Sequence, residues 1–302
     1  MYASWVLTAL LVWPLLAGGI VLLAPARLAK FIALAASLVE FAISVPLWWT
    51  FVPSGGMQLT ADYAWIAAWG IHYTVGVDGI SLFMVLLTTF LMPLSILGSW
   101  SYITKREPGF YSLLLVLTTG MIGVFVALDL FLFYVMWEVM LIPMYFIIGV
   151  WGGDNRLYAA IKFFIYTFLG SLLMLVAILV LYLHAGQASG VYSFGYAHLL
   201  SNAKDLGSLA WWLFGAFFLA FAIKVPLFPL HTWLRRARRS ADGGVRDPRR
   251  HPVEDGDLRV PAVRAAVLPG GRPESNRAAR HRGAGADRDH LRRSRSDGAA
   301  GL

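Results

Sequence analysis

Seven stretches of about 20 mostly apolar residues constrain this chain more than any other feature. A helix needs about 20 such residues to cross the hydrocarbon core of a bilayer. The stretches lie at approximately 5–23, 29–51, 80–103, 111–128, 130–151, 158–183 and 209–234. Of all residues, 58% are apolar and 14% are charged, whereas soluble domains have roughly 45–50% and about 25%. The sequence therefore predicts an all-α fold, a polytopic transmembrane helical bundle of about seven spans.

The composition changes abruptly after residue 234. Residues 235–302 hold seventeen Arg and nine acidic residues but no aromatic residue, Ile, Met or Lys, whereas residues 1–234 have a net charge of zero. Such a segment cannot bury enough apolar surface to fold, so we expect a disordered, Arg-rich C-terminal tail. Three interpretations of this segment are open. It is a tail that binds anionic lipid or nucleic acid, or a plain solvated tail, or the product of GC-rich codons that are read out of frame. The abrupt change favours the shifted frame.

The distribution of basic residues in the short loops predicts the orientation. The loops after the first, third and fifth helices hold Arg27 and Lys30, Lys105 and Arg106, and Arg156. The opposite face holds Lys204, which Asp205 offsets. Because basic loops stay on the cytoplasmic side, we expect these three loops to be cytoplasmic and the N-terminus and residues 53–77 to lie outside.

Apart from Lys30 at the edge of the second stretch, four charged residues fall within the apolar stretches, where charges are costly and therefore candidates for function. They are Glu40, Glu138, Lys162 and Lys224. Lys162 is close enough to the cytoplasmic end to extend to water, and Glu40 is open to a structural reading as a neutral acid bonded to a neighbouring helix. Glu138 and Lys224 have opposite signs at similar mid-membrane depth, which predicts a buried pair.

Proline residues predict a break beside Lys224. Pro226 and Pro229 follow it closely, and proline removes a helical hydrogen bond and clashes with the preceding turn. Broken helices at mid-depth are typical of transport sites. His231 adds a titratable group, either as a structural hydrogen-bonding residue or as part of a proton relay. Pro143 should kink the helix that carries Glu138.

Four segments carry a family resemblance. They are GVDGISLFMVLLTTFLMPL, DLFLFYVMWEVMLIPMYFIIGVWGG, RLYAAIKFFIYTFLGSLLML and FAIKVPLFPLHTWL. Residues 1–234 resemble the proton-translocating, antiporter-like subunits of respiratory complex I, the NADH–quinone oxidoreductase, and above all its chain M family. The resemblance implies fourteen transmembrane helices with two inverted repeats, each with a broken helix. It divides this chain into helices at 1–108, the first part of the proton-translocating domain at 109–234, and the tail at 235–302.

The resemblance also implies roles for individual residues. Glu138 and Lys224 would form the ion pair of a proton half-channel, with Pro226 at the helix break and with Lys162 and His231 as further proton-transfer groups. Separating the pair would favour proton release from Lys224, since two charges about 4 Å apart interact by about 4 kcal/mol at an effective dielectric constant of 20. The continuation that the family has after HTWL is missing from this sequence, which again favours a shifted frame.

The implied complex places its redox chemistry elsewhere. NADH, FMN, iron–sulfur clusters and quinone would bind other subunits, and we expect no cofactor or metal site in this chain, which has no Cys. Its expected partners are the other membrane subunits, the lipid bilayer and protons, with no nucleic acid, in a bacterial inner membrane. The alternatives are a subunit of a related multi-chain sodium/proton antiporter or membrane hydrogenase, or an inactive truncated fragment.

Overall fold

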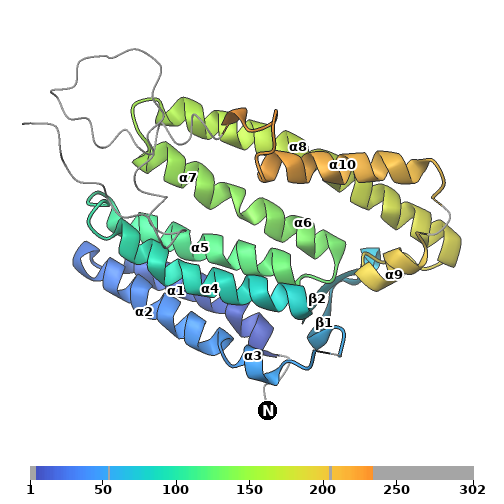
Figure 1. Ribbon diagram of the computed structural model, residues 1–302, viewed down its shortest axis with the longest axis horizontal. Helices are drawn as coiled ribbons and strands as arrows, with labels where there is room; N and C mark the ends of the chain where they lie inside the picture. The colour runs from blue at the N-terminus through green and yellow to red at the C-terminus, as the bar shows by residue number, and fades with distance from the viewer. Residues whose placement is uncertain (1–4, 54, 204–205, 234–302) are drawn as a thin grey trace, which may run out of the picture. The chain divides into compact units, whose positions relative to one another are not determined.

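The computed structural model describes residues 5–53, 55–203 and 206–233, which form a bundle of helices with one β-hairpin (Figure 1). The elements are α1 (Trp5–Leu23), α2 (Ala26–Ser44), α3 (Leu47–Thr50), β1 (Gln58–Ile66), the 3-10 turn η1 (Ala67–Trp69), β2 (Ile71–Val77), α4 (Gly79–Ser99), α5 (Glu107–Val126), α6 (Leu130–Val139), α7 (Leu141–Trp151), α8 (Arg156–Ser189), α9 (Tyr196–Ser201) and α10 (Leu209–Lys224). The tail predicted at 235–302 lies outside the described residues and stays a prediction.

Six helices in the described part of the chain are long and apolar enough to cross a bilayer, which confirms the predicted membrane bundle. The seventh apolar stretch differs from the expected span over 209–234. Its helix, α10, has 16 residues and ends at Lys224, a length of about 24 Å against about 30 Å of hydrocarbon. The helix ends there because Pro226 has no N–H to donate and its ring clashes with the preceding turn.

The N-terminal helices α1, α2, α4 and α5 pack against one another. Alanine side chains on α2 (Ala29, Ala33 and Ala36) lie in their common core, and such small residues let helices approach closely in a membrane. Three side-chain hydrogen bonds join neighbouring helices: Trp13 Nε1 to Ala36 O at 2.9 Å, Ser44 Oγ with Thr89 Oγ1 at 2.7 Å, and Thr119 Oγ1 to Leu11 O at 3.2 Å. These hydrogen bonds therefore fix how far each helix is shifted along its axis relative to its neighbours.

The fifth apolar stretch is divided at Met140 into α6 and α7. The predicted effect of Pro143 is confirmed, because this residue cannot donate the hydrogen bond that the carbonyl of Val139 would otherwise accept. Glycine residues on α5 let the kinked segment pack closely: a Cβ atom at Gly120 would lie 2.5 Å from Met140 Cγ.

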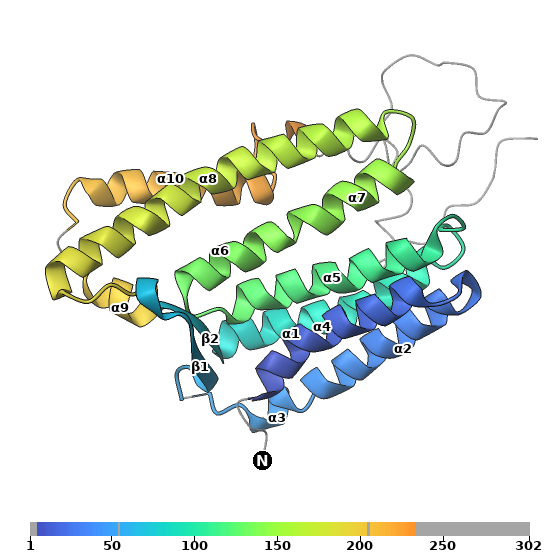
Figure 2. The same cartoon turned by 180° about the vertical axis from the view of Figure 1, so that it is seen from behind.

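The antiparallel hairpin β1–β2 lies at one end of the helices (Figure 2). Asp129 joins it to α6, since Oδ1 accepts from the backbone N–H groups of Phe131 and Leu132 at 2.9 and 3.0 Å, and Oδ2 accepts from His72 N at 3.1 Å. Burial raises the pKa of the Asp129 carboxyl. The sequence predicted an external segment here but no strands.

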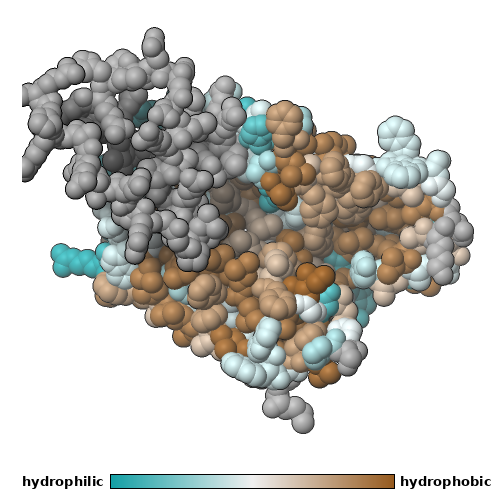
Figure 3. All heavy atoms as spheres, in the orientation of Figure 1, coloured by the Kyte–Doolittle hydropathy of each residue, from teal (hydrophilic) through white to brown (hydrophobic). Residues whose placement is uncertain are grey.

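The outer surfaces of the helices are apolar. Figure 3 shows brown, hydrophobic side chains along the helices and paler ones near their ends. Leu16 and Ile20 on α1 and Leu169 on α8 are among the large apolar side chains that are more than half exposed. Lipid tails are the environment in which such surfaces are stable.

Candidate functional site

The ammonium group of Lys224 lies where α10 ends, deep in the helices. α10 runs beside α8 in both ribbon views (Figures 1 and 2). Lys224 Nζ is buried and has no hydrogen-bond partner among the described residues. The last turn of a helix carries partial negative charge from its free carbonyl groups, which favours a cation there.

The indole ring of Trp137 on α6 faces this ammonium group. Lys224 Nζ lies 4.9 Å from the ring centroid, within the range of a cation–π interaction. Trp137 is 6% exposed and is held between Phe221 on α10, edge-on at 5.1 Å, and Phe133 at 5.7 Å. Trp137 was not among the residues predicted for this site, although an aromatic residue directly before a mid-membrane Glu is a signal that the sequence contains.

Glu138 forms no ion pair or hydrogen bond with this ammonium group in the described part of the chain. The two side chains interact electrostatically, yet Glu138 Oε1 is buried and has no hydrogen-bond partner among the described residues. Tyr134 and Ser171 also interact with the carboxyl group. The structure thus brings the predicted pair into one region without forming an ion pair between them.

The carbonyl groups in the last turn of α10 accept hydrogen bonds from residues that follow the helix. The carbonyls of Phe221 and Ala222 accept from Val225 N at 2.8 Å and Leu227 N at 2.9 Å. The carbonyl of Ile223 accepts from Trp233 Nε1 at 2.9 Å. Irregular backbone at membrane depth is tolerated only where the protein itself satisfies it. Trp233 therefore holds the helix end that presents Lys224.

Two other predicted residues, His231 and Lys162, lie on segments other than α10. The His231 ring stacks on Phe228, with 5.7 Å between centroids, and its buried Nδ1 has no partner among the described residues. Lys162 is half-buried near the start of α8. Gly170, which contacts Ile223, is eight residues further along α8, or about 12 Å. Phe163, the residue after Lys162, packs against Trp233 with 5.1 Å between ring centroids, and Trp233 bonds to the end of α10.

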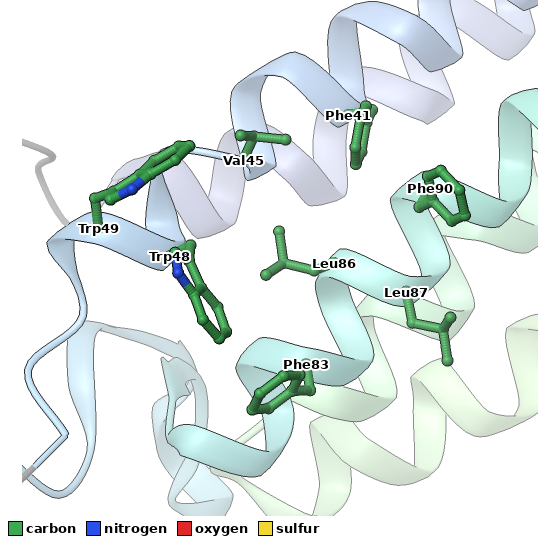
Figure 4. Close-up of a pocket in the computed structure, with 8 residues that line it drawn as sticks. All are labelled: Phe41, Val45, Trp48, Trp49, Phe83, Leu86, Leu87 and Phe90. Carbon is green, nitrogen blue, oxygen red and sulfur yellow. The ribbon is translucent and has the colours of Figure 1, made fainter.

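An apolar groove on another part of the surface lacks chemistry of this kind. It encloses about 400 Å³ between α2, α3 and α4 (Figure 4) and is lined by Phe41, Val45, Trp48, Trp49, Phe83, Leu86, Leu87 and Phe90. None of these side chains is titratable. Elsewhere in the described residues, no three His, Cys, Asp or Glu side chains gather as a metal site would require.

Comparison with known proteins gives two adjoining family matches. Residues 28–128 match "NADH-ubiquinone oxidoreductase chain 4, amino terminus", and residues 127–242 match "NADH:quinone oxidoreductase/Mrp antiporter, TM". Subunit M of the NADH-quinone oxidoreductase of Rhodobacter capsulatus is 50% identical over 220 residues, which are 69% of this chain and 41% of the relative. The Escherichia coli K12 subunit M is 41% identical over 227 residues, 71% of this chain and 44% of the relative. The chain spans less than half the length of these relatives.

Solved structures of membrane complexes share the fold. A chain of respiratory complex I from Thermus thermophilus with bound NADH has a TM-score of 0.67 and 29% identity, over 78% of this chain and 47% of that one. A chain of the Mrp complex from Dietzia has the same TM-score at 18% identity, over 78% of this chain and 25% of that one. The second likeness is one of fold alone.

Proposed function

Because residues 28–242 belong to the family of antiporter-like membrane subunits of NADH:quinone oxidoreductase, we propose that this chain supplies a proton-transfer site to such a complex. The proposed activity couples electron transfer from NADH to quinone, in other subunits, with proton translocation through this one. NADH, FMN, iron–sulfur clusters and quinone would all be held by those subunits. Its partners are the neighbouring membrane subunits, in a bacterial inner membrane.

One observation carries the proposal: a lysine at a helix end whose buried Nζ has no hydrogen-bond partner among the described residues and interacts electrostatically with Glu138 on another helix. An uncompensated charge at this depth costs several kcal/mol. Lys224 therefore binds its proton only as strongly as its neighbours stabilise the cation. A change in the position of Glu138 relative to Lys224 alters that stabilisation and so loads or releases the proton.

Three groups around Lys224 have distinct roles in this mechanism. Glu138 supplies the charge that stabilises the protonated state. The Trp137 ring supplies a weaker attraction that does not titrate and keeps the ammonium oriented when Glu138 is distant. Pro226 interrupts the helix, and the break gives water a polar route at mid-depth. His231 lies on the far side of the break and would pass protons onward, and Lys162 would exchange them near the cytoplasmic end of α8.

The test is to replace Lys224 by alanine in a full-length subunit that carries these residues within its complex. We expect NADH-driven proton uptake by membrane vesicles to fall at least tenfold in Lys224→Ala, and to fall in Glu138→Gln. Lys105→Ala is the matched control, because Lys105 is exposed in the α4–α5 loop. Proton uptake that is unchanged in Lys224→Ala, with the complex assembled, would overturn the proposal.

A second candidate is a subunit of a multi-chain sodium/proton antiporter, because the family model that matches residues 127–242 also describes Mrp antiporters. Everted vesicles distinguish the two. Proton movement that is driven by a sodium gradient without NADH supports the antiporter, whereas proton movement that requires NADH oxidation supports the first proposal. If the chain is an inactive fragment, neither gradient moves protons.

A further inference from the structure

The N-terminal helices contain a second buried carboxyl group that the proposed function does not use. Glu40 lies in the fourth turn of α2, and its side chain is 0% exposed. Neither Oε1 nor Oε2 has a hydrogen-bond partner among the described residues. α2 packs against α1, α4 and α5, whereas Lys224 lies on α10, which packs against α8.

Interhelical hydrogen bonds fix the level of Glu40 within the bundle. Trp13 on α1 bonds to the carbonyl of Ala36, one turn before Glu40, and Ser44, one turn after it, bonds to Thr89 on α4. The carboxyl group therefore lies between two turns of α2 that are each hydrogen-bonded to a neighbouring helix. Along the helix axis, Ala26 at the start of α2 lies about 21 Å from Glu40 and Ser44 at its end about 6 Å, and the residue itself is fully buried.

Proline residues leave two carbonyl groups of the packed helices without their usual helical donor. Pro93 cannot donate to the carbonyl of Thr89, nor Pro14 to that of Leu10, so both carbonyls lack their usual helical donor. The hydroxyl groups of Ser37 and Thr89 already donate their protons to backbone carbonyls, those of Leu34 and Leu86. A carboxylate needs donors, whereas a protonated carboxyl is itself a donor.

No opposite charge faces Glu40 from the packed helices. α1 and α4 contain no Asp, Glu, Lys, Arg or His, and the titratable residues of α5 are Glu107 and Tyr111. The basic residues of α2 itself are Arg27 and Lys30, in its first turns. Lys30 is ten residues from Glu40, or about 15 Å along the axis, and its Nζ lies over the Trp100 ring at 5.1 Å.

We propose that Glu40 is a proton-binding site at mid-depth in the N-terminal bundle, occupied by a proton at neutral pH and separate from the site at Lys224. The assignment rests on a fully buried carboxyl that has no hydrogen-bond donor among the described residues and no basic residue on the helices α1, α4 and α5 that pack against it. Burying an isolated carboxylate is far more costly than burying a neutral acid. Release of the proton would place an unpaired charge between α1, α2, α4 and α5 and force the bundle to admit water. The proposal does not depend on the proposed function.

Infrared spectroscopy of the whole chain in lipid bilayers tests it directly. A protonated carboxyl absorbs in the C=O stretching region above the amide band, whereas a carboxylate does not. At neutral pH we expect wild type minus Glu40→Gln to show a protonated-acid band, at the high-frequency end because the group accepts few hydrogen bonds, and this band should shift in deuterated water. Alkaline titration should convert it to carboxylate bands.

Two variants control for folding and assignment. Glu40→Asp keeps the carboxyl and should retain a protonated-acid band, which shows that loss of the band in Glu40→Gln is not a loss of structure. Glu107→Gln removes a carboxyl at the start of α5 and should leave the neutral-pH band unchanged. A wild type that shows only carboxylate bands from Glu40 at neutral pH, or a band that disappears in Glu107→Gln instead, would overturn the assignment.

Discussion

At the scale of single residues, the unusual feature is how Lys224 is accommodated. A buried ammonium group normally requires an anion or several acceptors, because the loss of hydration is costly. Here the described neighbours are an aromatic face at 4.9 Å, the end of a helix and a carboxyl that interacts without contact. This arrangement stabilises the charge less than an ion pair would, which is the condition for a proton to be both bound and released.

The contribution of the aromatic face can be measured by a double-mutant cycle. We expect Trp137→Leu to lower the free energy of unfolding, with a coupling to Lys224→Met of about 0.5–2 kcal/mol. Phe133→Leu serves as the control for lost aromatic packing, since Phe133 contacts Trp137 and should show no coupling to Lys224→Met. Chemical denaturation in detergent gives all the values. A zero coupling for Trp137 would show that the ring packs without attracting the cation.

At the scale of elements, periodicity and apolar length predicted the helices well. The break beside Pro226 and the kink near Pro143 also followed from residue chemistry. The hairpin was missed because β2 buries Val75, Gly76 and Val77 in succession, so its pattern does not alternate as a half-exposed strand does. The Trp137–Lys224 contact was missed because it depends on the relative rotation of α6 and α10, which no local pattern encodes.

Asp129 connects elements, and its replacement tests that connection. We expect Asp129→Ala to cost about 1–2 kcal/mol, because it removes two hydrogen bonds at the start of α6 as well as the bond from His72 N. Asp129→Asn should cost less. Hydrogen exchange of the backbone N–H groups of Phe131 and Leu132 should accelerate in the alanine variant. Unchanged exchange there would contradict the capping role.

The same residue makes stability depend on pH. Because burial raises the pKa of Asp129 in the folded state, the folded protein binds this proton more strongly than the unfolded chain. Its contribution to stability is therefore complete below the ordinary pKa of about 4 and is lost as the pH rises through the raised value. Denaturation of the wild type compared with Asp129→Asn should show this slope only in the wild type.

At the scale of the whole molecule, the membrane orientation that the basic loops predict can be tested directly. The chain has no Cys, so a single introduced cysteine is a unique label site. We expect a membrane-impermeant maleimide to label Thr60→Cys, on exposed β1, in intact cells, and to label Lys105→Cys after the membrane is opened. The reverse pattern would show that the basic loops lie outside.

The short length of α10 has a consequence for how the protein is made. A helix about 24 Å long that ends in a lysine is a weak signal for insertion, because a lysine is costly in hydrocarbon and the segment falls short of the bilayer core. Its packing partner α8 is 34 residues long and precedes it in the chain. Synthesis from the N-terminus thus delivers the partner first, and α10 enters the bilayer against a surface that is already in place. Insertion of α10 therefore depends on α8. Substitutions on the face of α8 that packs against α10 should reduce the insertion of α10 even where they leave Lys224 and its neighbours unchanged.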